Sequence, residues 1–200
     1  MDDDYLDVVV LSQLAAASMK PEAIRPEGAS SRQDALYREF VSGLDAAVER
    51  LARGYESNEA RRQDLVQEIH VALWRSFANF DGRCSLRTWV YRVAHNVAVS
   101  HVLRDRKDGS SRLVGLEEIE NLADPTATDK LVEQRHALDR LLELIRSLTR
   151  IDRQVILLYL EGEDAGAIGD VTGLSASNVA TKIHRIKKVL ASRFQGGSHG

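Results

Sequence analysis

The chain has 200 residues, of which 44% are hydrophobic and 28% are charged. This length and composition suit one or two globular domains with a buried core. The formal net charge of −3 argues against a protein that coats nucleic acid over its whole surface. The charge is unevenly distributed, because residues 61–116 hold ten bases against five acids and residues 162–200 hold five bases against three acids. Two basic zones separated by acidic chain are therefore the informative feature of the composition.

The apolar run near the amino terminus, in MDDDYLDVVVLSQLAAASM, follows an acidic flank and is too short to span a bilayer. We therefore predict a cytoplasmic protein without membrane insertion. Cys84 is the only cysteine, which excludes an internal disulfide and a multi-cysteine zinc site. A small structural residue is a simpler interpretation of Cys84 than a redox role.

The sequence carries no pattern typical of an enzyme. Its six histidines show neither an HExxH motif nor paired-ligand spacing. It also has no glycine-rich phosphate loop and no nucleophile elbow. We therefore predict no catalytic residue, no metal site and no cofactor.

In chain order, residues 1–32 are predicted to be a weakly ordered extension, because Pro21, Pro26 and Gly28 would break a long helix. Helical spacing begins at about Gln33. A second helix is predicted in DLVQEIHVALWRSFANF, where apolar residues recur every three or four positions. Its apolar stripe comprises Leu65, Ile69, Ala72, Leu73, Phe77 and Phe80. DGRCS then predicts a turn, and Ser85 is the predicted N-cap of a third helix.

Residues 108–130 are predicted to be an acidic, flexible linker, rich in glycine and serine. Beyond it, residues 131–148 and 153–162 have the spacing of amphipathic helices. Residues 195–200 are predicted to be a disordered tail. No useful length of chain alternates with a period of two, so we predict an all-α protein of two lobes.

The second lobe contains the pattern helix, glycine turn, helix, which is typical of a helix-turn-helix. Ala165, Ile168 and Val171 are predicted to face inward on the first helix, and Gly173 allows the tight turn. Gly166 and Gly169 are expected to weaken that helix by roughly 1 kcal/mol each relative to alanine.

The helix after this turn carries no acid from Ser175 to Phe194. Its outward-facing residues are predicted to be Ser175, which caps it, together with Ser177, Asn178, Thr181, Lys182, Arg185 and Lys188. Small polar groups at a helix amino terminus can approach bases closely, and long bases further along reach phosphates or guanine edges. The alternative interpretation is a solvated amphipathic helix that happens to be basic.

The first lobe carries the other basic zone, from Arg83 to Lys107, which combines bases with aromatic residues as single-stranded nucleic acid requires. Trp89 and Phe77 lie on apolar stripes and are expected in the core. Thr88, Arg92, His95 and Asn96 share another, polar face of the third helix, so Asn96 is interpreted as functional. Asp64, Gln67 and Glu68 form a polar group on the second helix, which either favours the helix dipole or docks a partner.

Two blocks together resemble an RNA polymerase sigma factor of the extracytoplasmic-function (ECF) class. DLVQEIHVALWRSFANFDGRCSLRTWVYRVAHNVAVSHVLRDRK (64–107) resembles its region 2, and LTRIDRQVILLYLEGEDAGAIGDVTGLSASNVATKIHRIKKVL (148–190) resembles its region 4. The resemblance implies a region 2 helical bundle over residues 33–107 and a region 4 helix-turn-helix domain over 131–194, joined by the flexible linker.

The resemblance also implies the function and its partners. Such a protein binds core RNA polymerase, directs it to promoter DNA and helps to melt the −10 element, and many members are held by an anti-sigma factor. The core-binding residues would be Asp64, Gln67 and Glu68. The −10 residues would be Phe80, Arg83, Arg87, Arg92, Asn96, Arg104 and Arg106. The −35 residues would be the outward face of the recognition helix.

The alternative function is a helix-turn-helix transcriptional regulator that acts without docking on polymerase. Such a regulator needs a ligand-binding or dimerisation domain in its first lobe. The segments DLVQE, FDGR and TWVYRVAHN stand there instead, which favours the sigma factor.

Overall fold

The computed structural model describes residues 27–107 and 130–196, with side chains from 32 to 104 and from 134 to 194. Within these ranges the chain forms seven α-helices and no strand, which confirms the predicted all-α fold. None of the helices in the described ranges is long and apolar enough to cross a membrane. The extension up to residue 26, the linker from 108 to 129 and the tail from 197 onward lie outside the described residues.

The first lobe is a bundle of three helices. They are α2 (Glu27–Tyr55), α3 (Glu59–Phe77) and α4 (Leu86–Lys107). α2 begins earlier in the chain than the predicted start at Gln33. Ser85 is the N-cap of α4, as predicted, because its Oγ accepts a hydrogen bond from the Thr88 amide at 3.0 Å. The large side chains in the interior are Phe40, Leu51, Leu65, Ile69, Leu73, Phe77 and Tyr91.

The turn after α3 corrects the prediction for Phe80. α3 ends at Phe77, so Phe80 does not extend the apolar stripe of the helix. The backbone amides of Asn79 and Phe80 bond back to the carbonyls of Ser76 and Phe77, at 2.9 and 3.3 Å, and close the helix in a turn. The Phe80 ring then packs edge-on against Trp89, with ring centroids 5.4 Å apart.

The second lobe consists of four helices. They are α5 (Lys130–Ser147), α6 (Arg150–Leu160), α7 (Ala165–Thr172) and α8 (Ala176–Gly196). Thr149 caps α6 and Asp164 caps α7, each through a side-chain oxygen that accepts a backbone N–H. The buried apolar residues of this lobe include Ile145, Val155, Leu158, Ile168, Val179 and Ile186.

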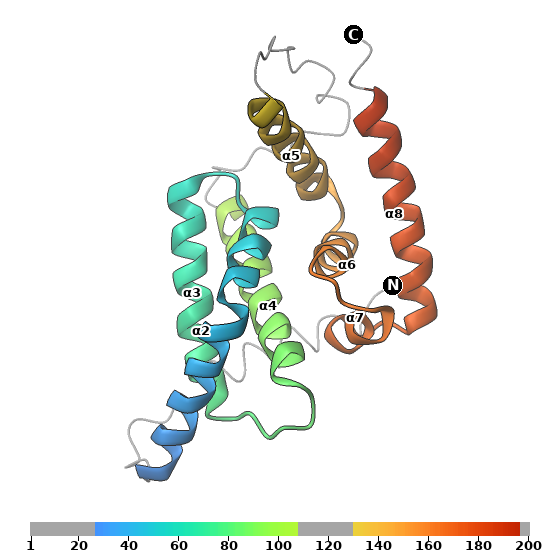
Figure 1. Cartoon of the computed structure of the whole chain (residues 1–200). Coiled ribbons are helices and arrows are strands. Elements are labelled where there is room, and N and C mark those ends of the chain that lie inside the picture. Colours follow the sequence, from blue (N-terminus) through green and yellow to red (C-terminus); the bar gives the residue numbers. More distant parts are fainter. Residues whose placement is uncertain (1–26, 108–129, 197–200) are drawn as a thin grey trace.

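The two lobes lie side by side (Figure 1), with α5 against α2 and α7 against α4. One continuous hydrophobic cluster runs through both lobes. Gly54 allows the close approach of α6, because a Cβ atom there would lie only 2.5 Å from Cδ2 of Leu157. The side chain of Leu157 therefore packs directly on the backbone of α2 near its carboxyl end.

His95 corrects the prediction that it belongs to the polar face of α4. Its side chain is fully buried, and its Nδ1 lies 2.8 Å from the hydroxyl of Tyr55. Thr88, from the same predicted face, is also buried and bonds to Ser85 at 2.8 Å. The spacing of polar residues could not reveal this for His95, because Tyr55, which contacts it, belongs to another helix, α2. Burial lowers the pKa of His95 to about 3.

His95 should make the stability of the protein depend on pH. Its ordinary pKa is about 6.5, so the unfolded state takes up a proton that the folded state resists. The free energy of unfolding should therefore fall as the pH drops below about 6.5 towards 3. Between pH 7.5 and 5 the loss from this group should be about 2 kcal/mol. Denaturant unfolding of His95→Gln should show a flatter pH dependence, whereas His184→Gln, at an exposed position, should not. An unchanged slope in His95→Gln would contradict the assignment.

The turn between α7 and α8 corrects the expectation for Gly169. A Cβ atom on Gly169 would lie 2.6 Å from the backbone oxygen of Leu174, so only glycine lets the turn fold back on α7. Gly173 ends α7 in the left-handed region, with φ +77°, and its amide bonds to the Gly169 carbonyl at 2.8 Å. Gly169 therefore stabilises the helix-turn-helix, although glycine has a low helix propensity.

Alanine substitutions at two glycines should have opposite effects on stability. Gly169→Ala should lower the free energy of unfolding by about 1–3 kcal/mol, because the backbone of the turn must move. Gly43→Ala should raise it by about 0.5–1 kcal/mol, because a Cβ atom there meets nothing within 4 Å and alanine favours the helix. Denaturant unfolding at one pH measures both. Equal stabilisation by the two substitutions would rule out the tight contact.

Candidate nucleic-acid interface

Helix α8 presents an open polar face. Ser175 caps it through an Oγ that accepts the amide of Asn178 at 3.3 Å. Val179 and Ile186 are buried on the opposite side. The residues of the predicted −35 face that lie exposed are Ser175, Ser177, Asn178, Thr181, Arg185 and Lys188. Their position leaves them accessible to DNA, and their contact with it stays a prediction.

Two cations of this face are tied to a residue that the sequence did not single out. Asp152, in the first turn of α6, accepts a hydrogen bond from Nζ of Lys182 at 2.8 Å. Its two carboxylate oxygens also accept from the NH2 nitrogen of Arg185, at 3.2 and 3.0 Å. Lys182 is consequently half-buried rather than fully turned to solvent as predicted.

The charge of Asp152 is stabilised in place. Burial would by itself raise the pKa of this carboxyl. Hydrogen bonds from Lys182 and Thr149, together with the positive charges of Lys182 and Arg185, outweigh burial and lower the pKa below its ordinary value. Asp152 is therefore ionised at neutral pH, and it neutralises part of the basic face of α8.

The predicted −10 residues around the α3–α4 turn are spread over an open surface. Arg83 is exposed and forms an ion pair with Asp81 at 3.0 Å. Phe80 is half-buried against Trp89. Asn96 is exposed on α4. The side chain of Arg106 lies outside the described residues. This surface combines an aromatic ring, a cation and an amide, which are the groups that an unstacked base can engage.

The predicted polymerase-docking group lies on the outer side of α3. Asp64 and Gln67 are exposed. Glu68 forms an ion pair with Arg104 of α4, and its carboxylate is 3.6 Å from Nδ1 of His101. The structure therefore brings together Glu68 and Arg104, which the resemblance assigned to two different surfaces.

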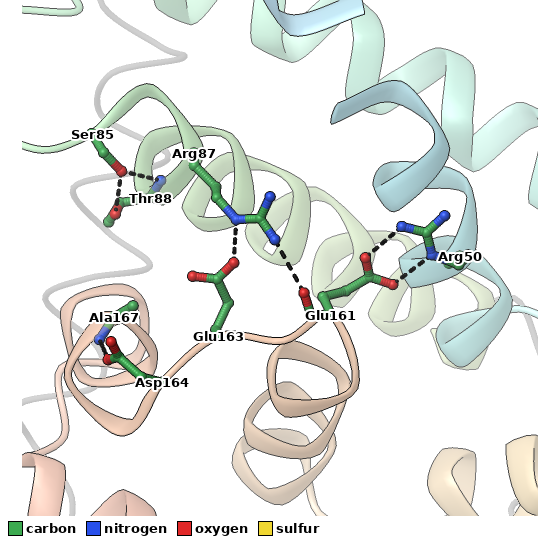
Figure 2. Close-up of polar contacts among 8 residues, drawn as sticks. All are labelled: Arg50, Ser85, Arg87, Thr88, Glu161, Glu163, Asp164 and Ala167. Carbon is green, nitrogen blue, oxygen red and sulfur yellow. Dashed lines mark hydrogen bonds and ion pairs between the residues drawn. The ribbon is translucent and has the colours of Figure 1, made fainter. Parts of the chain in front are cut away.

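Two more predicted −10 residues form hydrogen bonds to the second lobe. Arg87 pairs with the carboxylate of Glu163 and donates to the backbone oxygen of Glu161 at 3.1 Å. Arg92 donates to the backbone oxygen of Asp170. Figure 2 shows Arg87 lying between the two glutamates, which reach it from the segment joining α6 and α7. Both arginines remain exposed, but part of the donor capacity of each is used by the second lobe rather than left for DNA.

The same segment anchors α2. The Glu161 carboxylate accepts hydrogen bonds from Nε and Nη2 of Arg50, at 2.8 and 2.7 Å, which form a bidentate ion pair (Figure 2). The side chains of Glu161 and Glu163 are only 10% and 12% exposed. Burial opposes the charge of Arg87, yet the two carboxylates keep its pKa above the ordinary value. Two glutamates and two arginines thus compensate one another between the lobes.

Sequence reasoning missed this interface. From the sequence, Glu161, Glu163 and Asp164 are interpreted only as acids that precede the helix-turn-helix and need not meet DNA. Their partners lie 74 or more positions away in the chain, and helical spacing relates only residues a few positions apart. The one available signal was the distribution of charge along the chain. The basic zone of the first lobe and the acidic segment before α7 have complementary charge, which is what a contact between them requires.

Two family models match successive parts of the chain. The model of sigma-70 region 2 matches residues 41–108, which include the end of α2, all of α3 and all of α4. The model of sigma-70 region 4 matches residues 138–190, from within α5 to within α8. The two models thus cover separately the residues predicted to contact the −10 element and the predicted −35 face of α8.

Curated relatives resemble the chain over most of its length. RNA polymerase sigma factor NccH of Alcaligenes xylosoxydans xylosoxydans is 24% identical over 87% of this chain and 94% of its own. RNA polymerase sigma factor CnrH of Cupriavidus metallidurans is 27% identical over 90% of this chain and 99% of its own. ECF RNA polymerase sigma factor SigX of Bacillus subtilis is 26% identical over 66% and 70%.

Solved structures share the fold. CnrH in complex with the cytosolic domain of CnrY has a TM-score of 0.62 and 21% identity, over 84% of this chain and 94% of that one. RpoE in complex with the anti-sigma factor NepR, from Bartonella quintana, has a TM-score of 0.57 and 18% identity, over 78% and 93%. Since regions 2 and 4 match in order and the relatives are sigma factors, the chain belongs to the extracytoplasmic-function class of RNA polymerase sigma factors.

Proposed function

We propose that this sigma factor binds core RNA polymerase and directs promoter-specific initiation by reading a −35 element with α8 and a −10 element with the first lobe. The observation that carries this proposal is the pairing of two matched regions with two polar surfaces on separate lobes. A regulator acting without polymerase would have no use for region 2, so we do not retain that alternative.

The individual roles follow from exposure and charge. Asp64, Gln67 and Glu68 dock on polymerase, and Phe80, with Arg83 and Asn96, engages the −10 strand. The remaining −10 contacts, to backbone phosphates, come from Arg87, Arg92, Arg104 and Arg106. The −35 contacts come from Ser175, Ser177, Asn178, Thr181, Lys182, Arg185 and Lys188. A protein acting in this way needs no catalytic group and works in the cytoplasm, where the polymerase is.

The closed arrangement limits when these roles are available. Arg87 donates to Glu163, and Arg92 donates to the backbone oxygen of Asp170. In the closed arrangement these donors are not available to the phosphates of DNA. Docking on polymerase therefore separates the lobes in this proposal. CnrH and RpoE, of similar fold, were solved with the proteins CnrY and NepR, the latter an anti-sigma factor. A partner of that kind would act on this chain by keeping its surfaces covered.

Reconstituted transcription tests the function. Core polymerase with the full chain should start transcripts at a defined set of promoters, and sequencing of the 5′ ends of those transcripts should reveal shared −35 and −10 elements. Core polymerase alone is the control. Tight binding of the free protein to the same DNA, with no entry into a polymerase complex, would overturn the proposal.

Two alanine substitutions separate the two reading surfaces. Asn96→Ala should bind core polymerase normally but slow open-complex formation, because a contact to the melted strand is lost. Arg185→Ala should weaken recognition of the −35 element by about 1–3 kcal/mol if the side chain reads a base. Permanganate footprinting and promoter-binding titrations measure these effects. Normal opening by Asn96→Ala, or unchanged binding by Arg185→Ala, would remove that residue from the site.

Loss of one carboxylate should loosen the contact between the lobes. Glu161→Gln keeps the size of the side chain but loses its bidentate pair with Arg50, which should weaken the contact by about 1 kcal/mol. Fluorescent labels at positions 75 and 192, on α3 and α8, should then report a longer mean distance in the free protein.

Glu49→Gln is the matched control, because it removes the same charge from an exposed position next to Arg50. The labels require Cys84→Ser in all variants. If Glu161→Gln and Glu49→Gln give the same distance distribution as the parent, the Glu161–Arg50 pair does not hold the lobes together.

A further inference from the structure

Asp152 is a buried carboxylate beneath the reading face of α8. It is 7% exposed and belongs to the first turn of α6, a different helix from the one that it supports. Thr149 fixes it from one side, because its hydroxyl donates to Oδ2 at 3.0 Å. Lys182 and Arg185, which lie one turn apart on α8, donate to it from the other side. The hydrogen bond from Thr149 thus fixes the orientation of the carboxylate independently of Lys182 and Arg185.

The contact leaves most of Arg185 available. Only its NH2 nitrogen bonds to Asp152, and 63% of its side chain remains exposed. Lys182 is more enclosed, with 25% of its side chain exposed. One nitrogen of the guanidinium is therefore fixed by the carboxylate. The other two nitrogens make no hydrogen bond to Asp152.

We propose that Asp152 is a positioning residue for −35 recognition, holding Arg185 and Lys182 in a fixed orientation on the outer face of α8. This inference rests on the proposed function, since it names the residue through which the reading face of that function is ordered. Asp152 itself need not touch DNA. It acts through the two cations that it orients.

Asp152 has opposite effects on the affinity for two kinds of DNA, the correct −35 element and any other sequence. A free arginine or lysine side chain loses rotamer entropy when it binds, so holding it in place beforehand lowers the cost of a geometrically demanding contact. The carboxylate also offsets positive charge, which weakens the sequence-independent attraction to phosphates. Removal of its charge should therefore weaken binding to the correct element and strengthen binding to any other DNA.

The test uses Asp152→Asn in holoenzyme made from core polymerase and the full chain. The two templates are a promoter mapped by the 5′-end sequencing and the same fragment with its −35 element scrambled. The ratio of affinities for the two templates should fall about tenfold in the variant. Binding to the scrambled template should become tighter and more sensitive to salt.

Two further variants separate positioning from a general effect of charge or folding. Asp164→Asn removes the same charge from the same lobe and keeps a good N-cap, so it should leave the ratio unchanged. Asp152→Glu restores the charge and should recover much of the ratio. In an Arg185→Ala background, Asp152→Asn should change the ratio much less than it does alone. A role in stability alone would lower binding to both templates in the same proportion.

The outcomes distinguish this inference from the proposed function. If the parent protein binds the two templates equally well, the proposed −35 recognition is wrong, and the positioning role of Asp152 is overturned together with it. If the parent distinguishes them and Asp152→Asn does so equally well, only the positioning role is overturned.

A measurement on the unaltered chain covers the case in which Asp152→Asn fails to fold. Nitrogen relaxation of arginine side chains should show Nε of Arg185 more ordered than Nε of Arg193, which is exposed in the last turn of α8. Equal mobility of the two would overturn the inference.

Discussion

Carboxylates of the second lobe neutralise arginines of the first, and the closed arrangement of the protein depends on this pairing. Close packing of α6 on α2 at Gly54 places Glu161 beside Arg50. An almost buried glutamate without a partner would cost several kcal/mol, so the ion pairs are a condition for closing the lobes rather than an addition to it. The same constraint brings α7 onto α4, where Arg87 and Arg92 end against the second lobe.

The ion pairs of this interface can exchange their anions, whereas separation of the lobes also exposes part of the apolar cluster that they share. An arginine that leaves a carboxylate can donate to a phosphate with similar geometry, because both acceptors accept its planar fork in the same way. In the proposed function, the arginines that pair with the second lobe in the closed form are thus the ones that bind phosphates on DNA.

Local patterns predicted the parts of this molecule that local interactions determine. The all-α class, the N-cap at Ser85 and the turn at Gly173 follow from spacing and residue type. The burial of His95 and the role of Gly169 do not, because each depends on a segment that tertiary packing brings close. The candidate site divides in the same way. The exposed face of α8 was predictable from periodicity, whereas the partners of Arg87 and Lys182 come from other helices and leave no periodic signal.

The two surfaces assigned to DNA differ in how their cations are held. Arg87 and Arg92 are bound across the boundary between the lobes, so separation of the lobes releases them. Arg185 and Lys182 are bound to Asp152 within one lobe, so the same movement leaves that contact intact. In the proposed function, Arg185 and Lys182 are therefore held in every arrangement of the lobes, whereas Arg87 and Arg92 regain all their donors only when the lobes part. On that proposal, duplex DNA meets a preformed face on α8, and separation of the lobes adds the full phosphate-binding capacity of Arg87 and Arg92 to the first lobe.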